Sequence, residues 1–407
     1  RVTRHIPDDG LSDIPRSVRD ALNASGVAER LLPNGEVAIG VGSRGIAGLP
    51  QIVRATVDWF RERGARPFLV PCMGSHGGAT AEGQLRVLEH LGVTAASAGC
   101  PIRAGMDTIV IGTLDNGLPV HMDAHATSAD GVFVINRVKP HTSFRGRYES
   151  GLMKMMAIGL GKQHGAENIH HQSPGIMHEL VEEYGRAVME NCPILGGIAI
   201  VENAYDETYL VKGLSPEEII TEEPKLRDLS YETIAHLLFD ECDVLVVDKI
   251  GKNFSGDGMD PNISGRFVQP QYCSGGIDAE KVVILDLSDE THGNAQGIGL
   301  AEVTTRRLFN KMKLEMTYPT GVTNTFLHLM KIPMIMDNDR EALQLALCCC
   351  PDAEDQNNMK MIRIPNTAHI DVIEISEGML PLAKANPNIE ILSEPYELAF
   401  DENGNLF

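Results

Sequence analysis

A lysine at position 154 stands inside a run of small and apolar residues, SGLMKMMAIGLG (150–161), whereas a lysine on a surface helix has polar neighbours. Ser150 is able to cap a helix that starts at Gly151. On that helix the lysine's face also holds Ser150, Gly151, Ala157, Ile158 and Gly161. Most of these residues are small, so the pattern predicts that a bulky group can lie beside the Lys154 amine. The alternative is a lysine on a tightly packed helix that extends its amine to solvent.

Four histidines are candidates for proton exchange or metal binding, because the ordinary pKa of histidine, about 6.5, lies near neutral pH. His76 is flanked by glycines in GSHGG, so its ring and backbone can approach a ligand closely. His141 lies in RVKPHTSFRGR. His170 and His171 are adjacent and point to different sides in most backbone conformations, so at most one of them is expected to act as a ligand or base. The alternative for this pair is an ordinary surface position.

Positive charge gathers around His141, at Arg137, Lys139, Arg145 and Arg147. The chain as a whole is acidic, with 35 − 56 = −21 formal charges. Such a field repels phosphate backbones and anionic membrane surfaces, which argues against nucleic-acid and membrane partners. A basic cluster against this background is typical of a loop that recognises an anion.

Several familiar motifs are absent from the sequence. It lacks the GxxxxGK[ST] fingerprint of phosphate-binding loops, as well as HExxH, GxSxG and a CxxC pair. The one GxGxxG match, GVGSRG (40–45), is a weak signal by itself, so a Rossmann-type hydride carrier is disfavoured. Eight cysteines without metal-ligand spacing fit a reducing compartment, and no stretch approaches 18 apolar residues, so we expect a cytoplasmic protein.

Short apolar runs alternate with helix-period segments, which predicts an α/β fold with mostly parallel sheets. At 407 residues the chain exceeds the usual size of one core, so two α/β domains are expected. The charged stretch GLSPEEIITEEPKLRD (213–228) is the candidate hinge, although it has helical character. We therefore predict an N-terminal domain over residues 1–228, a C-terminal domain over 229–407, and an active-site cleft between them.

In open α/β sheets, ligands bind beyond the carboxyl ends of the strands. The polar residues at these ends are Ser43 and Arg44 at the end of EVAIGVGS (36–43), His76 in RPFLVPCMGSHGG (66–78), Arg137, Lys139 and His141 at the end of GVFVINRV (131–138), and Glu202 and Asn203 at the end of GGIAIVEN (196–203). In the second half, Lys249 and Lys252 hold the same kind of position. We expect these two lysines to contact substrate or shield it from water when the second domain closes.

Three of these features together resemble the nickel-dependent lactate racemases and their 2-hydroxyacid racemase and epimerase relatives. The first is the Gly-[Ser/Thr]-His loop that follows a strand, Gly74-Ser75-His76 here. The second is a histidine, His141, shortly before SGLMK (150–154). The third is His170, at a spacing of 170 − 154 = 16 residues from the lysine. The resemblance covers roughly residues 36–205.

The resemblance implies a cofactor on Lys154. This is a covalently attached nickel-pincer nucleotide, nickel pyridinium-3,5-bisthiocarboxylic acid mononucleotide, with Ser150 and Gly151 beside it. His170, or alternatively His171, would supply the protein ligand to nickel. Cofactor-biosynthesis proteins would then be partners, and protein made in a host that lacks them would be empty at Lys154.

The resemblance also implies that His76 and His141 are paired general acid/bases, and that Arg44, helped by Ser43, binds the substrate carboxylate. Direct deprotonation of a 2-hydroxy acid at C2 is hard, because the proton is weakly acidic and the carboxylate is already negative. Removal of a hydride instead gives a planar 2-keto acid that can be reduced on either face. This route needs one base on each side for the hydroxyl proton.

Two other functions remain open at this point. One is a cofactor-free or ordinary metal-dependent lyase or hydrolase, in which Lys154 is a plain amine and the histidines bind zinc or act as bases. The other is a non-catalytic protein that holds a small carboxylate. The sequence does not define which 2-hydroxy acid a racemase would use, because Leu152 and Met153 replace the Gly-Arg of the lactate-racemising pattern.

Overall fold

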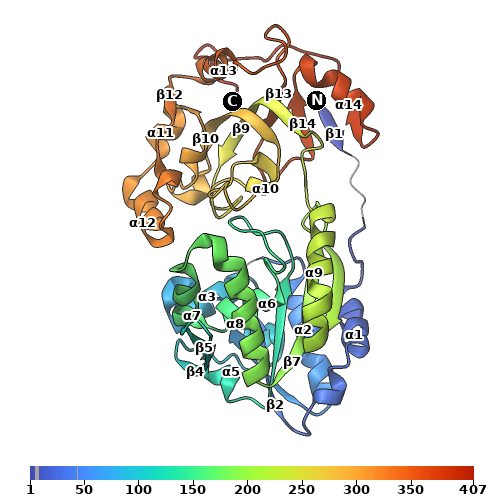
Figure 1. Ribbon diagram of the computed structural model, residues 1–407. Coiled ribbons are helices and arrows are strands. Elements are labelled where there is room, and N and C mark those ends of the chain that lie inside the picture. Colours follow the sequence, from blue (N-terminus) through green and yellow to red (C-terminus); the bar gives the residue numbers. More distant parts are fainter. Residues whose placement is uncertain (5–8, 44) are drawn as a thin grey trace. The chain divides into compact units, whose positions relative to one another are not determined.

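The computed structural model of the chain describes residues 1–4, 9–43 and 45–407. It divides into two compact units, one made of residues 9–234 and the other of residues 1–4 together with 235–407. Each is an α/β unit built mainly on parallel strands, as predicted (Figure 1). The division lies between Ile234 and Ala235 rather than after residue 228, because residues 216–233 form one continuous helix.

The first unit is built on a five-stranded sheet with the order β3-β2-β6-β7-β8. Its strands are β2 (Glu36–Val41), β3 (Arg66–Pro71), β6 (Gly131–Arg137), β7 (Ile194–Glu202) and β8 (Thr208–Leu214). The first four in spatial order are parallel, and β8 returns antiparallel to β7. The apolar run 107–114 instead supplies β4 (Thr108–Thr113), which pairs with β5 (Pro119–Asp123) in a separate antiparallel ribbon.

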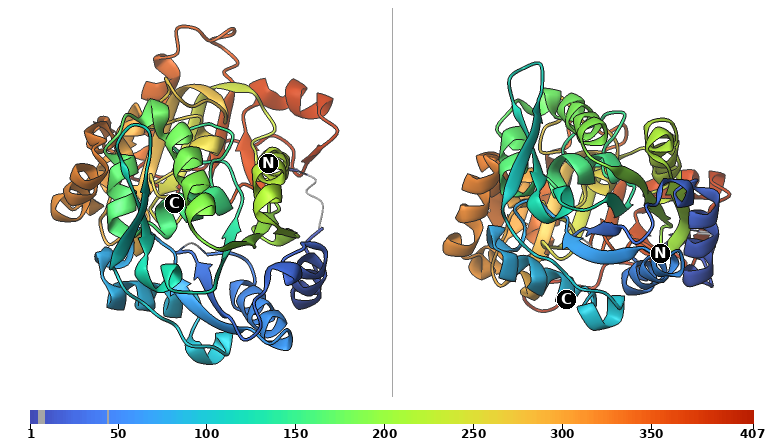
Figure 2. Two further views of the ribbon diagram at one scale, coloured as in Figure 1. Left: turned by 60° about the horizontal axis from the view of Figure 1, so that its bottom comes forward. Right: turned by 90° about the horizontal axis from the view of Figure 1, so that it is seen from below.

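Helices cover both faces of this sheet (Figures 1 and 2). Along β6, Val132 and Val134 belong to one core while Phe133 and Ile135 belong to the other, as the two-residue period of a strand requires. One face is covered by α1 (Ile14–Ala24), α2 (Leu49–Glu62) and α3 (Ala81–His90). The other is covered by α6 (Leu152–Lys154), α7 (Lys162–His170), α8 (Met177–Asn191) and α9 (Pro216–Thr233). Two one-turn helices, α4 (Ala95–Ala98) and α5 (Ala124–Thr127), complete the unit.

Helix α9 occupies the stretch that the sequence marked as a candidate hinge. Ser215 and Glu218 form a reciprocal capping box at its start, and Pro216 takes the first helical position, where a missing backbone N–H costs nothing. These local signals explain why a charged, proline-containing segment is helical here.

The second unit carries an eight-stranded sheet with the order β12-β11-β10-β9-β13-β14-β1-β15. The strands from β12 to β13 are parallel neighbours, and β14, β1 and β15 pair antiparallel. Their bounds are β1 (Val2–Arg4), β9 (Glu241–Ile250), β10 (Asp278–Leu287), β11 (Val303–Thr305), β12 (Met334–Met336), β13 (Met361–Ile364), β14 (Val372–Ile375) and β15 (Ile389–Ile391).

The helices of the second unit are α10 (Pro261–Ser264), α11 (Arg306–Lys311), α12 (Leu314–Asn324), α13 (Asp339–Cys348) and α14 (Leu380–Ala385). Val303–Thr305 extends the sheet as β11, and α11 begins directly after it at Arg306. The Thr305 side chain caps α11 by accepting from the Leu308 N–H, which fixes the transition. Among the residues that the structure describes, no helix is long and apolar enough to cross a membrane.

The first strand of the chain, β1, belongs to the second unit, where it lies between β14 and β15. We expect removal of residues 1–4 to expose the edges of β14 and β15 and to accelerate amide hydrogen exchange there. Exchange in β2 of the first unit is expected to stay unchanged. Hydrogen-exchange mass spectrometry on the truncated and full chains checks this. Equal protection of residues 372–375 in both would contradict it.

Candidate active site

The carboxyl ends of β2, β3 and β6 lie side by side, since Val41 at the end of β2 is in register with Pro71 of β3 and Ile135 of β6. The loops that follow these strands therefore begin at one edge of the sheet. The Ser43 hydroxyl and Nδ1 of His76, which come from two of these loops, form a hydrogen bond. Ser43, predicted to bind substrate, thus holds the His76 ring. Arg44 lies outside the described residues.

Lys154 ends the short helix α6 and is followed by a π-helical turn over Met155–Gly159. Its Nζ lies 2.5 Å from Nε2 of His141, so the structure brings together the lysine and one of the predicted bases. The Phe144 ring stacks on His141 at a centroid distance of 4.2 Å and lies 5.8 Å from the Lys154 amine. π-Helical turns are rare in proteins, and those that occur are often found at functional sites.

The small residues after Lys154 serve a different purpose from the predicted one. The π-helical turn shifts the helical phase, and Ala157 and Gly161 are buried in the protein rather than open beside the lysine. A Cβ on Gly161 would lie 2.7 Å from the Ala157 carbonyl oxygen, and one on Gly159 would lie 2.6 Å from Sγ of Cys72. The small size of Gly159 lets the segment after β3 pack directly against the turn.

Ser150 does not cap α6 as predicted. It pairs with Lys139 through two backbone hydrogen bonds of 3.0 and 3.2 Å, and Gly151 precedes the helix in an extended conformation. The N-terminus of α6 is held instead by Glu223 of α9, whose carboxylate accepts the Met153 N–H at 3.1 Å. A Cβ on Gly151 would lie 2.2 Å from Oε1 of Glu223, so glycine allows this approach.

His141 has a defined hydrogen-bonding state. The Ser143 N–H donates to its Nδ1 at 3.1 Å, and its Nε2 faces the Lys154 amine. Burial lowers the pKa of His141 well below its ordinary value, and the nearby positive charges of Lys154, Lys139 and Arg145 lower it further, as does His170. The ring is therefore neutral at neutral pH.

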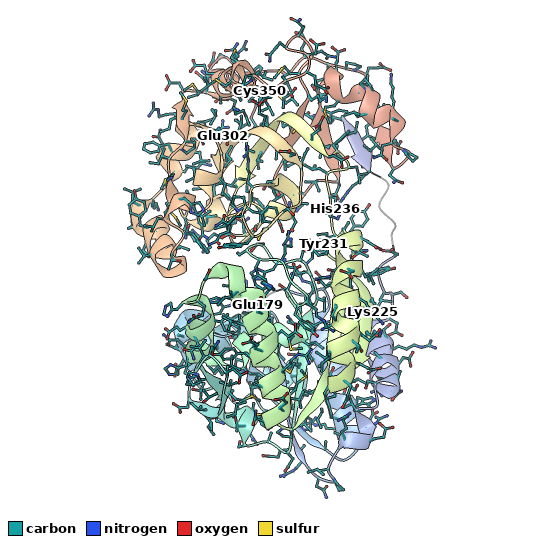
Figure 3. The ribbon with its side chains drawn as sticks, viewed as in Figure 1. Glu179, Lys225, Tyr231, His236, Glu302 and Cys350 are labelled. Atoms are coloured by element: carbon teal, nitrogen blue, oxygen red, sulfur yellow. The ribbon has the colours of Figure 1, made fainter. Side chains whose placement is uncertain are left out.

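The loop that carries His141 is anchored by Glu149, which is 2% exposed. Its carboxylate accepts the His141 N–H at 2.8 Å and the Tyr231 hydroxyl of α9 at 3.0 Å (Tyr231 is labelled in Figure 3). Arg145 donates to the His141 carbonyl oxygen, and Arg227 donates to that of Gly146. Burial raises the pKa of Glu149 despite these donors.

The arginines of the predicted anion-binding cluster each face a carboxylate of the protein. Arg137 pairs with Glu202, Arg145 with Glu149, and Arg147 with Glu182. Each of these three arginines is thus paired with a carboxylate of the protein, and anion recognition by the cluster stays a prediction. Glu202 also accepts the Ala47 N–H at 2.8 Å, which fixes the loop after β2.

His170 is the last residue of α7, and His171 is its C-cap. Part of the His170 side chain reaches solvent, yet the protein packed around the ring lowers its pKa to about 4, with further contributions from the charges of Lys154 and His171. The charge of Lys154 thus lowers the pKa of both His141 and His170. Among the described residues, no group of three or more His, Cys, Asp or Glu side chains is placed to hold a metal ion.

Lys249 and Lys252 belong to the other unit. Lys249 is the penultimate residue of β9, with Nζ 5.8 Å from the centroid of the Phe407 ring, and Lys252 lies exposed in the turn that follows. Their contact with substrate stays a prediction.

Three residues that hold the site were not predicted from the sequence. Glu223 and Tyr231 belong to α9, and Glu149 lies in the loop that carries His141. Glu149 was detectable as the single acidic residue between the basic segment RGRY and SGLMK. Glu223 carries no such signal, because it stands among other acidic residues in PEEIITEEP (216–224).

Glu223 gives the first unit a pH-dependent stability. Burial raises the pKa of Glu223 from 4.5 to about 8 in the folded protein. The protonated side chain therefore stabilises the fold at low pH, and this stabilisation is lost as the pH rises from near 4.5 through 8. We expect Glu223→Gln, which keeps the acceptor for the Met153 N–H, to exceed the wild type in stability at pH 9 by on the order of 2–4 kcal/mol. At pH 5 the two are expected to differ little.

Urea unfolding followed by the fluorescence of Trp59, the single tryptophan of the chain and a core residue of the first unit, measures this. Glu222→Gln is the matched control. Lys225 and Lys212 lower the pKa of Glu222, so its replacement is expected to bring no gain at high pH. A Glu223→Gln stability that runs parallel to the wild type from pH 5 to 9 would contradict the assignment.

Comparison with known proteins supports the fold of this chain. The family described as "Domain of unknown function (DUF362)" matches residues 41–212, which span the candidate site. No curated protein matches the chain. Among solved structures, the lactate racemase apoprotein from Thermoanaerobacterium thermosaccharolyticum is similar, with 14% sequence identity and a TM-score of 0.54 over 89% of this chain and 95% of that one. At this identity the likeness shows a shared fold.

Proposed function

We propose that this protein is a racemase or epimerase of a 2-hydroxy acid that works with a nickel-pincer nucleotide on Lys154. The observation that carries the proposal is the pairing of the Lys154 amine with His141 at 2.5 Å. The fold shared with a lactate racemase apoprotein supports it. So does the placement of His76 and His141 on loops that leave the same sheet edge.

The residues present fit such a cofactor. Lys154 offers a primary amine for covalent attachment beside a neutral imidazole, and His170 is a neutral nitrogen donor at neutral pH, as metal binding requires. One imidazole suits a metal whose other ligands belong to the cofactor, and it suits poorly a metal held by the protein alone. When bound, the cofactor supplies a reversible hydride acceptor.

The histidines handle the hydroxyl proton. His141 is neutral and held by Ser143, Phe144 and the loop anchored on Glu149, so its Nε2 has one orientation. Acylation of the Lys154 amine removes the positive charge that lowers the pKa of His141, and the ring becomes a stronger base. His76, held by Ser43 on a neighbouring loop, is proposed to act on the opposite face of the substrate. Arg44 is proposed to bind the carboxylate.

The cofactor is tested on protein from its native source, or co-expressed with pincer-synthesis enzymes, by intact mass, peptide mapping and nickel analysis. We expect an adduct on the peptide that contains Lys154 and about one nickel per chain. Lys154→Arg is expected to lose both. Lys225→Arg, at an exposed lysine of α9 (Figure 3), is the control and is expected to keep both. An unmodified Lys154 without nickel under these conditions would contradict the proposal and favour a lyase, a hydrolase or a carboxylate-binding protein.

The route of inversion is tested with 2-hydroxy acids deuterated at C2. If the C2 hydrogen leaves and returns with its electron pair, the inverted product is expected to keep its deuterium. Direct deprotonation by a histidine would exchange it with solvent. Replacement of His76 or His141 by Asn is expected to reduce kcat about 10²–10⁴-fold, because each removes a proton-transfer group. NMR of the product in H2O reads the isotope directly, and complete loss of deuterium would rule out hydride transfer.

A further inference from the structure

A second lysine in the same segment, Lys162, is fully buried. Its Nζ lies 2.9 Å from Oδ2 of Asp123, and both side chains are at most 1% exposed. The ammonium also donates to the Pro71 carbonyl oxygen at 2.5 Å and to Oε1 of Gln84 at 3.2 Å. The charge is therefore compensated on three sides in the protein interior.

Gln84 links Lys162 by hydrogen bonds to the loop that carries His76. It is fully buried in α3, and its Nε2 donates to the carbonyl oxygens of Gly74 at 2.8 Å and of His76 at 3.3 Å. Lys162 occupies Oε1, so the amide can present its nitrogen to the loop in one orientation only. A Cβ on Gly77 would lie 2.6 Å from the Gln84 N, which shows how closely loop and helix approach.

The backbone conformation and the burial of Lys162 both lower the stability of the fold. Its φ is +53°, in the left-handed region that lysine rarely adopts, and it begins α7 directly after Gly161. A buried ion pair gives little net stability compared with apolar side chains of the same size. Backbone strain and a buried charge at one residue are typical of a position kept for function.

The three groups around the Lys162 ammonium come from different elements of the first unit. Pro71 ends β3 just before the His76 loop, Gln84 lies in α3, and Asp123 ends β5. Lys162 itself begins the helix that ends at His170. One cation thus connects the His76 loop to the helix that carries the proposed nickel ligand.

We propose that Lys162 and Gln84 are positioning residues that fix the His76 ring relative to the site through hydrogen bonds to the backbone of its loop. This positioning role rests on the proposed function, in which His76 transfers a proton. The contact itself is testable whether or not the protein is a racemase.

The test compares Gln84→Leu, Gln84→Glu and Lys162→Met with the wild type, using protein labelled with ¹³C at the histidine rings. A His76→Gln variant assigns the His76 signal. Gln84→Glu keeps an acceptor for Lys162 but loses the donor to Gly74 and His76. Thr56→Val, which removes a buried hydroxyl from α2 on the same unit, controls for general loss of stability.

We expect both Gln84 variants to shift the His76 ring signal and to accelerate hydrogen exchange of residues 73–79 about tenfold, while Thr56→Val changes neither. Lys162→Met is expected to act in the same way if it folds. A His76 signal and loop exchange that match those of Thr56→Val in both Gln84 variants would overturn the proposal.

Activity separates this inference from the proposed function. If the wild type interconverts a 2-hydroxy acid, we expect the Gln84 variants to lower kcat about tenfold to a hundredfold with little change in KM, since a displaced base affects the reaction more than binding. If the wild type has no such activity, the proposed function fails, and the ring signal and exchange still decide whether Gln84 positions His76.

Discussion

The parallel alignment of β3, β2, β6 and β7 is the constraint on which the candidate site depends. Parallel strands in register end at one edge, and their backbone groups beyond that edge are free to turn into loops. The Ser43, His76 and His141 loops all begin there, and the π-helical turn after Lys154 packs against the end of β3 through Cys72 and Gly159. Residues far apart in the sequence come together because the loops that carry them begin at the same edge of the sheet.

Three buried glutamates then hold the segments that leave this edge. Glu202 accepts the Ala47 N–H after β2, Glu149 accepts that of His141 after β6, and Glu223 accepts that of Met153 in α6. A buried side-chain oxygen that accepts a backbone N–H pairs a polar group that would otherwise lose its hydrogen bond in the interior. Each loop is thereby fixed by an acidic side chain, while the imidazoles and amines remain for chemistry. This arrangement also explains why the arginines near His141 are used in internal ion pairs.

Sequence reasoning predicted the parallel strands and the common edge at which their loops begin, because buried parallel strands leave continuous apolar runs and their ends are marked by polar residues and glycine. It failed where local pattern and tertiary contact compete. Ser150 has the residue type of a helix cap, yet Glu223, 70 residues from Met153, takes that function. The face of Lys154 was assigned with a helical period that the π-helical turn changes.

Long-range partners of buried charges could not be predicted either. Nothing in the local sequence connects Lys162 with Asp123, or Glu149 with Tyr231, because these pairs form only when separate elements pack together. The strand β1 is a similar case, since a strand of three residues gives no periodicity to identify its partners.

The pairing of β1 with β14 and β15 also bears on the order in which the protein is made. A ribosome releases residues 9–234 as one uninterrupted segment, so the first unit can acquire its core while the remainder is still being synthesised. The second unit cannot close its sheet in this way, because β1 emerges before residues 9–234, and its neighbours at residues 372–375 and 389–391 emerge after them. The part of the sheet that contains β1 is therefore completed only after residues 372–391 have been synthesised.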